Sequence, residues 1–456
     1  MLLRRVEKRG SVDMLTPREH WSSRSGFILA AAGSAVGLGN IWKFPYLAGK
    51  HGGAAFLITY LALAFTIGLS VMLCEFIIGR AARKDPIGAF AKLKGGLWPI
   101  VGFMGIAAAF VILSFYSVVG GWTLAYIIKM LTGALDNGSA QELGKMFSNF
   151  IEDPIRPLFF HGAFMILTIS VVVGGIGKGI ERWCKILLPA LFVIILILLA
   201  RSLTLPGAMK GIEYFLQPDF SKLDAAAFNA ALSQAFFSLS IGMGAMITYG
   251  SYLDRKMHLP SATVWTTSLD TSIAFLAGLV ILPAVFAFGF DPKAGPGLTF
   301  ITLPAVFADM PGGAVFAPIF FVLLAIAALT SAVSLLEVVV TYLVDEKNLT
   351  RKTAAWLSGS IMFFIGIPAS LSLGVWKEYT LFGKGFFDLL DYLSSNLLLP
   401  LGGIFIALFV GWFFSEKALE EATANNQHSF PFAQVWMFIC RFIAPLAITW
   451  ILVSGL

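Results

Sequence analysis

The first long apolar segment of the chain contains Gly33-Ser-Ala-Val-Gly-Leu-Gly-Asn40. Repeated glycines weaken a helix because they add backbone freedom and provide no side chain to pack. A later apolar segment is interrupted in the same way by Ser238-Leu-Ser-Ile-Gly-Met-Gly244. For a single such stretch, close packing of membrane helices through small residues is the simpler explanation. Two matching interruptions favour helices that are broken near the middle of a bilayer.

The composition around these stretches is that of a membrane protein. Of the 456 residues, 58% are hydrophobic and 13% are charged, about half the charged share of a soluble domain. The apolar blocks are long enough to cross a hydrocarbon layer of ~30 Å as helices. We therefore exclude a soluble fold and predict about eleven transmembrane helices, near residues 26–48, 53–79, 98–132, 158–176, 184–202, 225–251, 263–289, 314–344, 353–373, 386–413 and 430–453.

The two interrupted segments are the first and the sixth of this series. This spacing predicts an all-α integral membrane fold with a five-plus-five inverted repeat, in which helices 1 and 6 are broken. The expected division is a cytoplasmic N-terminal segment (1–25), a first repeat of helices 1–5 (26–202), a second repeat of helices 6–10 (203–413) and helix 11 (414–456). We also expect a short interfacial helix over Leu298–Asp309.

Basic residues indicate how the chain is oriented. Lys and Arg are concentrated in 1–25, 80–96 and 177–185, which the positive-inside rule assigns to the cytoplasm. An odd number of helices then places the N-terminus inside and the C-terminus outside. Met1–Arg24 is basic and polar, without the apolar stretch of a signal peptide. We expect a multi-pass protein of the plasma membrane, in a bacterium the cytoplasmic membrane, and the net charge of +6 requires no nucleic acid.

No residue pattern indicates enzymatic chemistry. Cys74, Cys184 and Cys440 lie in apolar segments without paired spacing, and none of the five histidines forms an i, i+4 pair. We expect buried packing for the cysteines, no organic cofactor and no catalytic residue. Two alternatives to a transporter remain. An ion channel would show rings of charge or repeated filter loops, and a sensor would bind its ligand without moving it.

Several motifs follow one another in the order found in a known family. They are Arg18-Glu-His-Trp21, the Gly33–Asn40 stretch with Phe44-Pro45 after it, Gly177-Lys-Gly-Ile-Glu-Arg182, the Ser238–Gly244 stretch with Thr248-Tyr-Gly-Ser-Tyr252, and Leu329-Thr-Ser331. The chain resembles the neurotransmitter:sodium symporter family and its bacterial leucine-transporter-like members. It departs from the family in lacking a twelfth helix, which lies outside the repeat core. The resemblance implies a sodium-coupled, alternating-access symporter for hydrophobic L-amino acids, working in the lipid bilayer as a monomer or weak dimer.

The resemblance also implies two co-transported sodium ions. Unwound backbone supplies carbonyl oxygens that a continuous helix would keep engaged. One ion is expected at Ala35, Asn40, Ser238 and Asp270, together with an oxygen of the substrate carboxylate. The other is expected at the carbonyls of Gly33, Val36 and Ala327 and the hydroxyls of Thr330 and Ser331. Outside this motif, a Thr-Ser pair in an apolar helix more often bonds to the preceding turn.

Gly37 decides the class of substrate in this comparison. Family members that carry monoamines have an aspartate at this position, so here the substrate must bring its own carboxylate to the sodium ion. By resemblance the substrate contacts Ala35, Gly37, Leu38, Gly39, Ile112, Tyr116, Phe237, Ser238, Ser240, Met243, Ser331 and Leu335. Met243 replaces a phenylalanine of leucine-transporting relatives. Its flexible thioether would admit aromatic as well as aliphatic amino acids, unless it merely fills space.

Asp270 stands where the family usually has asparagine. A charge inside a membrane helix is costly unless it has a function. Chloride-dependent relatives hold an anion at the positions of Tyr60, Gln234, Ser238 and Asp270. We expect the Asp270 carboxylate to replace that chloride, so that transport is chloride-independent, and to take a proton when the empty carrier returns. The alternative is a protonated Asp270 packed beside Gln234.

Opposite charges on either side of the site are expected to act as gates. Lys43 and Asp391 would close the outside, although lysine lacks the bidentate fork of the family's arginine. Arg18 and Asp345 would close the inside, with Trp21, Ser251 and Tyr252 nearby. We expect Glu75 to support the broken sixth helix, and assign no role to Glu337 or Arg441. Gly179 and Pro189 weaken helix 5, which would let water reach the sodium at Thr330 and Ser331.

Overall fold

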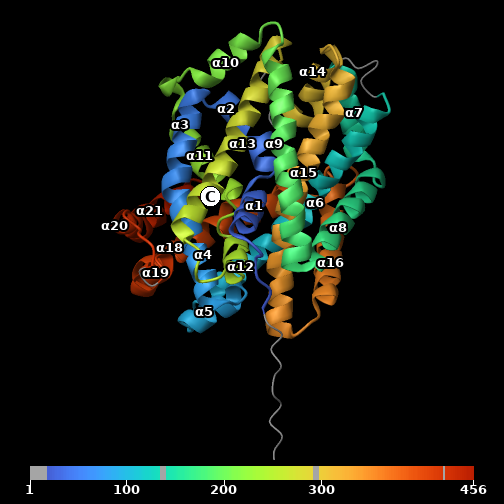
Figure 1. Cartoon of the computed structure of the whole chain (residues 1–456). Helices are drawn as coiled ribbons and strands as arrows, with labels where there is room; N and C mark the ends of the chain where they lie inside the picture. The colour runs from blue at the N-terminus through green and yellow to red at the C-terminus, as the bar shows by residue number, and fades with distance from the viewer. Residues whose placement is uncertain (1–17, 134–139, 291–296, 425–426, 456) are drawn as a thin grey trace, which may run out of the picture.

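The computed structural model describes residues 18–133, 140–290, 297–424 and 427–455, which form a bundle of long helices along one axis (Figure 1). Nine helices in these ranges are long and apolar enough to cross a membrane: Ala54–Ala82, Pro99–Leu131, Arg156–Val173, Ile176–Leu203, Leu259–Ala287, Gly313–Lys347, Arg351–Leu371, Phe386–Phe413 and Ala433–Ser454. The predicted all-helical membrane fold is confirmed. Residues 1–17 of the predicted N-terminal segment lie outside the described residues, and the boundaries of the two repeats remain a prediction.

The first broken helix consists of α1 (Arg24–Ala35), the π-helix η1 (Gly39–Lys43) and α2 (Phe44–Lys50). Ser23 caps α1 by accepting the N–H of Gly26, and Val36 ends it in an extended conformation (φ −70°, ψ 105°). The two halves are bent by 53° and together make a tenth crossing. The break therefore falls inside the glycine-rich stretch, as predicted.

The second broken helix consists of α11 (Ala225–Ser238) and α12 (Ala245–Ser251). Between them Ser240, Gly242 and Gly244 adopt positive φ angles of 55°, 82° and 72°. Glycine enters this region without steric cost, which explains why the chain can leave the helix here. Each half is too short to span a bilayer alone. The nine long helices and the bent first pair give up to ten crossings among the described residues, so the predicted number of about eleven is approximate.

The remaining crossings are built from the following elements: α3 (Ala54–Leu63), η2 (Ala64–Gly68) and α4 (Leu69–Ala82); α6 (Pro99–Leu131); α8 (Arg156–Val173); η3 (Ile176–Glu181) and α9 (Arg182–Leu203); α13 (Leu259–Ala287); α15 (Gly313–Lys347); α16 (Arg351–Leu371); α17 (Phe386–Tyr392), η6 (Leu393–Leu398), α18 (Leu399–Leu408) and η7 (Phe409–Phe413); α20 (Ala433–Phe438), η8 (Ile439–Ile443) and α21 (Ala444–Gly455). Shorter helices lie between them: α5 (Pro86–Leu93), α7 (Ala140–Glu152), α10 (Ala208–Leu216), η4 (Phe220–Lys222), η5 (Leu298–Thr302), α14 (Leu303–Asp309) and α19 (Ser415–Ala422).

The bundle has two distinct ends (Figure 1). The start of the described chain, just before α1, and α5 lie at the lower end, which we call the Arg18 face, and α7, α10 and α14 lie at the other, the Lys43 face. The predicted short helix is present there as η5 and α14. It does not lie on the surface of the bundle as an interfacial helix would, because Phe300 is fully buried and packs edge-on against Trp122 and Tyr126.

Helices α4 and α12 are in direct backbone contact. A Cβ added to Gly250 would lie 2.8 Å from the carbonyl oxygen of Phe76, and one added to Gly79 would meet the backbone of Ile247. Glu75 of α4 also accepts a hydrogen bond from the N–H of Gly242, 2.7 Å away. The Glu75 carboxylate thus provides a hydrogen-bond acceptor for a backbone N–H of the unwound chain before α12. This is the supporting role expected from the sequence.

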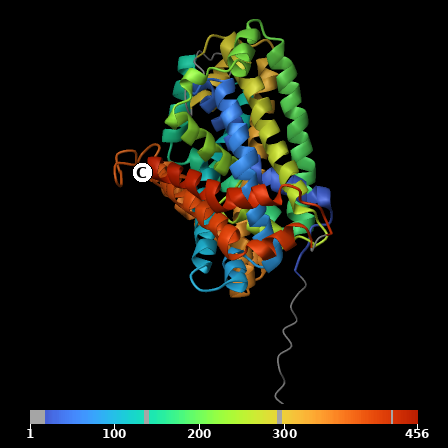
Figure 2. The ribbon, with the colours of Figure 1, turned by 90° about the vertical axis from the view of Figure 1, so that its left-hand side faces the viewer.

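The last helices pack on one side of the bundle (Figure 2). Trp436 donates its indole N–H to the Ser70 carbonyl at 3.1 Å, and Cys440 lies 3.4 Å from Cys74, sulfur to sulfur. All three cysteines are free and buried, consistent with the predicted packing role. No group of His, Cys, Asp or Glu suited to a metal ion occurs among the residues that were placed.

Candidate transport site

The end of α1 faces α15 across a row of oxygen atoms. The Ser331 hydroxyl donates to the carbonyls of Ser34 (3.1 Å) and Val36 (3.2 Å). The Thr330 hydroxyl bonds instead to the Ala327 carbonyl of its own helix at 3.1 Å. A Cβ added to Gly33 would lie 3.4 Å from the Thr330 side chain. The five residues predicted for the second sodium site therefore lie together, and Ser331 connects the two helices.

Asp270, on α13, is the centre of a fully buried polar network. Its Oδ1 accepts from Asn40 Nδ2 at 2.8 Å, and both carboxylate oxygens lie 2.9 Å from the Ser238 hydroxyl. The Tyr60 hydroxyl donates to Oδ2 at 3.2 Å. Asn40 Oδ1 accepts the N–H of Gly37 at 3.0 Å, which ties the network to the break in α1. The structure thus brings two other predicted sodium ligands, Asn40 and Ser238, onto the Asp270 carboxylate.

Gln234 is the one member of the predicted chloride-substitute set outside this network. Its Nε2 donates to the Gly39 carbonyl at 2.8 Å, and its Oε1 is buried without a hydrogen-bond partner. Gln234 therefore holds the backbone of η1 through its amide. The alternative of a protonated Asp270 packed beside Gln234 stays a prediction.

A central cavity lies between the two broken helices. It is lined by Ser34, Ala35, Gly37, Gly39, Asn40, Ile112, Tyr116, Phe237, Ser238, Ser240, Met243, Ser331 and Leu335. The list contains every predicted substrate residue except Leu38, whose N–H donates to the Tyr116 hydroxyl at 3.2 Å. The cavity measures about 20 Å³, so a bound amino acid requires these side chains to move apart.

Gly37 has no room for a side chain. A Cβ at this position would lie 2.6 Å from the Ser331 hydroxyl oxygen and 3.1 Å from that of Tyr116. The Tyr116 hydroxyl also accepts a hydrogen bond from the Leu38 N–H. An aspartate in place of Gly37 would therefore displace two hydroxyl groups of the site.

Two serines of the site were not predicted from the sequence. The Ser34 hydroxyl donates to Ser334 at 2.7 Å and lies 3.2 Å from that of Ser240. The Ser240 hydroxyl in turn donates to the Ser34 carbonyl at 2.8 Å. One signal in the sequence could have identified Ser334: it follows Ser331 by three residues, which places both on one helix face.

A vestibule of about 410 Å³ opens above the cavity, at the Lys43 face. Lys43 and Asp391 both line it. They form no ion pair among the described residues: Lys43 Nζ lies 5.6 Å from the centre of the Phe237 ring, and Asp391 accepts from the Ser395 hydroxyl at 2.9 Å. The structure thus brings the predicted outer gate residues to one vestibule but leaves them apart.

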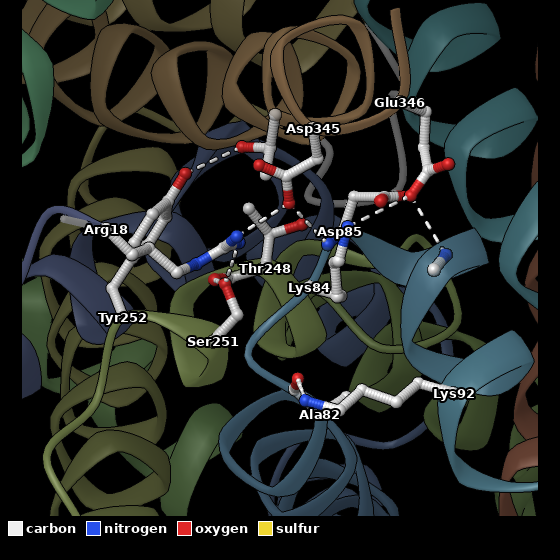
Figure 3. Close-up of polar contacts among 12 residues, drawn as sticks. Arg18, Ala82, Lys84, Asp85, Lys92, Thr248, Ser251, Tyr252, Asp345 and Glu346 are labelled. Carbon is white, nitrogen blue, oxygen red and sulfur yellow. Dashed lines mark hydrogen bonds and ion pairs between the residues drawn. The ribbon is translucent and has the colours of Figure 1, made fainter. Parts of the chain in front are cut away.

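The Arg18 face is closed (Figure 3). Arg18 forms an ion pair of 2.6 Å with Asp345, donates to Ser251 at 2.7 Å and lies 4.8 Å from the centre of the Tyr252 ring. Trp21 donates its indole N–H to the Tyr249 carbonyl at 3.0 Å. All the residues predicted for the inner gate meet here, and Tyr249 joins them.

Glu337 and Arg441, left without a role by the sequence, have defined partners. Glu337 accepts a hydrogen bond from the Tyr252 hydroxyl at 2.8 Å and forms an ion pair with Arg351. It therefore holds a gate residue in place. Arg441 donates to the Gly411 carbonyl at 2.6 Å, between the last two crossings.

The comparisons with known proteins point to one family. The sequence pattern of the sodium:neurotransmitter symporter family matches residues 18–145 and 160–456. The chain is 42% identical to the sodium-dependent transporter YhdH of Bacillus subtilis, over 94% of this chain and 95% of that protein. It is 40% identical to a sodium-dependent transporter of Haemophilus influenzae, over 96% and 98%.

The chain is also similar to a protein of known structure. The crystal structure of MhsT in complex with L-phenylalanine superposes with a TM-score of 0.89 at 48% sequence identity, over 96% of this chain and 100% of MhsT. Such agreement in sequence, fold and broken helices leads to one assignment. The chain is a membrane protein of the sodium:neurotransmitter symporter family, whose members are sodium-dependent transporters and not enzymes.

Proposed function

We propose that the chain is a symporter that couples two sodium ions to the uptake of hydrophobic L-amino acids, aromatic as well as aliphatic. The observation that carries the proposal is the central cavity, which has no charged side chain among its lining residues. An apolar substrate side chain would therefore enter without leaving a charge unpaired. The ammonium and carboxylate would bind to the free backbone groups of the two breaks, where helix ends stabilise charge.

The substrate carboxylate is proposed as a ligand of the sodium ion at Ala35, Asn40, Ser238 and Asp270. Gly37 supports this role. Monoamine carriers have a carboxylate at this position, whereas here the space for a side chain is occupied by the hydroxyl groups of Ser331 and Tyr116. The second ion would bind at Gly33, Val36, Ala327, Thr330 and Ser331. L-Phenylalanine, the compound bound to MhsT, supports an aromatic substrate, and Met243 is the flexible wall that would adapt to it.

The decisive experiment is uptake into proteoliposomes under an imposed sodium gradient, tested with each of the twenty amino acids. Phenylalanine, leucine and isoleucine should accumulate, saturably and only with sodium, while glutamate and lysine should not. Unsaturable flux would indicate a channel, and binding without uptake would indicate a sensor. Preference for a charged amino acid would overturn the proposed pocket.

Chloride independence is proposed from Asp270. Its carboxylate lies within hydrogen-bond distance of Tyr60 and Ser238, where it would supply the negative charge that chloride supplies elsewhere. Uptake should persist when chloride is replaced by gluconate. The Asp270→Asn variant should need chloride, whereas Asp254→Asn, at an exposed aspartate, should behave as the parent. Loss of parental uptake in gluconate would refute this part of the proposal.

The proposed orientation places the Arg18 face in the cytoplasm. The Lys/Arg-rich segments near that face support it. A protease site added ahead of Arg18 should be cut in inside-out vesicles and protected in right-side-out vesicles. The reverse pattern would invert the topology and leave the proposed sites unchanged.

A further inference from the structure

Asp85 lies in the linker between α4 and α5 and is completely buried at the Arg18 face. Its Oδ1 accepts the N–H groups of Ile87 (3.0 Å) and Gly88 (3.2 Å) and so caps α5. Its own N–H donates to Asp345 Oδ2 at 2.9 Å, the same oxygen that binds Arg18 (Figure 3). One carboxylate oxygen and the backbone of Asp85 are thereby engaged.

The second carboxylate oxygen, Asp85 Oδ2, is buried and has no hydrogen-bond partner. It faces Glu346: a Cβ built on Gly88 would lie 2.7 Å from Asp85 Oδ2 and 2.8 Å from Glu346 Oε1, so the two oxygens are at most 5.5 Å apart. A buried carboxylate oxygen without a donor is costly. A proton on Oδ2 removes that cost and provides a donor toward Glu346.

The surrounding cations are already paired with other groups. Arg18 binds Asp345 at 2.6 Å, and Lys84 lies 3.5 Å from Glu346. Lys92 of α5 donates to the Ala82 carbonyl at 2.8 Å, and the neighbouring Arg83 is exposed. Helix α6, which packs against α5, carries only Lys129, near its opposite end. Within the described ranges, Asp85 therefore lies between two carboxylates of α15 with no cation of its own.

Burial raises the pKa of Asp85 to about 7, and the negative charges of Asp345 and Glu346 add to this effect. An aspartate in water has a pKa near 4. The geometry and the charge balance thus agree that this carboxyl holds a proton more readily in the closed face than an aspartate does in water.

We propose that Asp85 is a proton-binding site of the Arg18 face, which takes up a proton when the face closes and releases it when the face opens. The inference rests on the proposed alternating access. The closed face binds the proton more tightly, so falling pH favours closure and rising pH favours opening. Asp85 lies at the Arg18 face, so the proton enters and leaves on the same side. The bound proton therefore regulates the gate and is not carried across the membrane.

The magnitude follows from the two pKa values. With a pKa of about 7 when closed and about 4 when open, the ratio of closed to open molecules rises about tenfold between pH 8 and pH 6. Below pH 4 both forms are protonated and the effect is complete.

The test measures access to α12 beneath Arg18. Thr248, fully buried there, is replaced by cysteine in the full chain in lipid nanodiscs without sodium. Its alkylation by an impermeant maleimide is followed from pH 6 to pH 8 and normalised to a free thiol at each pH. The parent without Thr248→Cys gives the background of the three buried cysteines. Alkylation should increase about tenfold over this range.

Three variants separate Asp85 from other groups. Asp85→Asn keeps the helix cap and imitates the protonated carboxyl, so alkylation should be slow at every pH. Glu346→Gln removes a neighbouring charge, so the midpoint should move to lower pH. Asp254→Asn, at an exposed aspartate, should match the parent.

The outcomes distinguish this inference from the proposed function. A pH response that survives in Asp85→Asn, or an unmoved midpoint in Glu346→Gln, overturns the role of Asp85. If Asp85→Asn does not fold, Glu346→Gln alone decides. Absence of sodium-driven uptake by the parent at any pH is the separate failure of the proposed function.

Discussion

The two faces of the bundle differ in whether their charged residues form an ion pair. At the Arg18 face, an ion pair, a hydrogen bond to Ser251 and the rings of Trp21 and Tyr252 close the path. At the Lys43 face, Lys43 and Asp391 line a vestibule of about 410 Å³ without pairing. The same kind of charge pair is thus made at one end and open at the other. This asymmetry is what the proposed alternating-access mechanism predicts for a carrier whose site is open to one side at a time.

The largest effect is expected at the closed face. Arg18→Ala removes hydrogen bonds to a charged group, each contributing ~1.5–3 kcal/mol. Alkylation of Thr248→Cys should then increase about 10- to 100-fold. Lys43→Ala, at the open face, should change it little. Arg24→Ala is the matched control, because Arg24 donates to the Ser261 hydroxyl in an exposed hydrogen bond. Equal effects of Arg18→Ala and Lys43→Ala would mean that the two faces do not differ in the proposed way.

The second effect concerns the central cavity, which lies between the two faces. Gly37→Ala places a methyl group 2.6 Å from the Ser331 hydroxyl, and overpacking of this kind costs ~1–3 kcal/mol. The dissociation constant of the amino acid should rise about 5- to 100-fold in equilibrium binding. Gly177→Ala, where an added Cβ meets nothing within 4 Å, serves as control. Unchanged binding by Gly37→Ala would contradict the placement of the substrate.

The third effect tests how the closed face opens. Pro189 lies inside α9, and alanine is preferred over proline in a helix by ~3 kcal/mol. Pro189→Ala should slow sodium release toward the Arg18 face in stopped-flow measurements, because the substituted helix resists unwinding. Gly179 is a poor second site, because an added Cβ would meet the backbone of Val171 and Gly174. Release at the parental rate would show that α9 need not unwind.

The smallest effect is expected at the open face. Lys43→Arg supplies the planar fork that pairs better with a carboxylate such as Asp391. Ion pairs that remain exposed contribute only ~0.2–1 kcal/mol. Dissociation of labelled amino acid into the vestibule should slow about two- to threefold. An acceleration would mean that Lys43 does not act through Asp391.

The sequence was sufficient to predict the two broken helices and most of the residues that line the cavity, because both depend on short stretches of the chain. The glycine-rich stretches located both broken helices because glycine adopts the positive φ angles found at Gly242 and Gly244. The residues around them lined the cavity because each broken helix presents its free backbone groups inward. Leu38 was an exception: it lines the vestibule instead.

Long-range contacts were not predictable from these patterns. Asp85 precedes Pro86, an ordinary start of a helix, and only the approach of α15 buries it beside Glu346. Gln234 was expected near Asp270, yet it turns to the Gly39 carbonyl. Whether Lys43 meets Asp391 depends on the conformation of the carrier, which no residue pattern records.

The close backbone contact of α4 and α12 limits which parts can move. Neither helix can slide or rotate against the other, because Gly79 and Gly250 leave no gap and Glu75 holds the chain before α12. The two helices therefore form a rigid wall of the inner pathway. Ser251 belongs to that wall, and Arg18 is attached to it only by side-chain contacts and by the Trp21 backbone bond to Tyr252. Under the proposed alternating access, opening would separate the described residues from Arg18 to Trp21 from this wall.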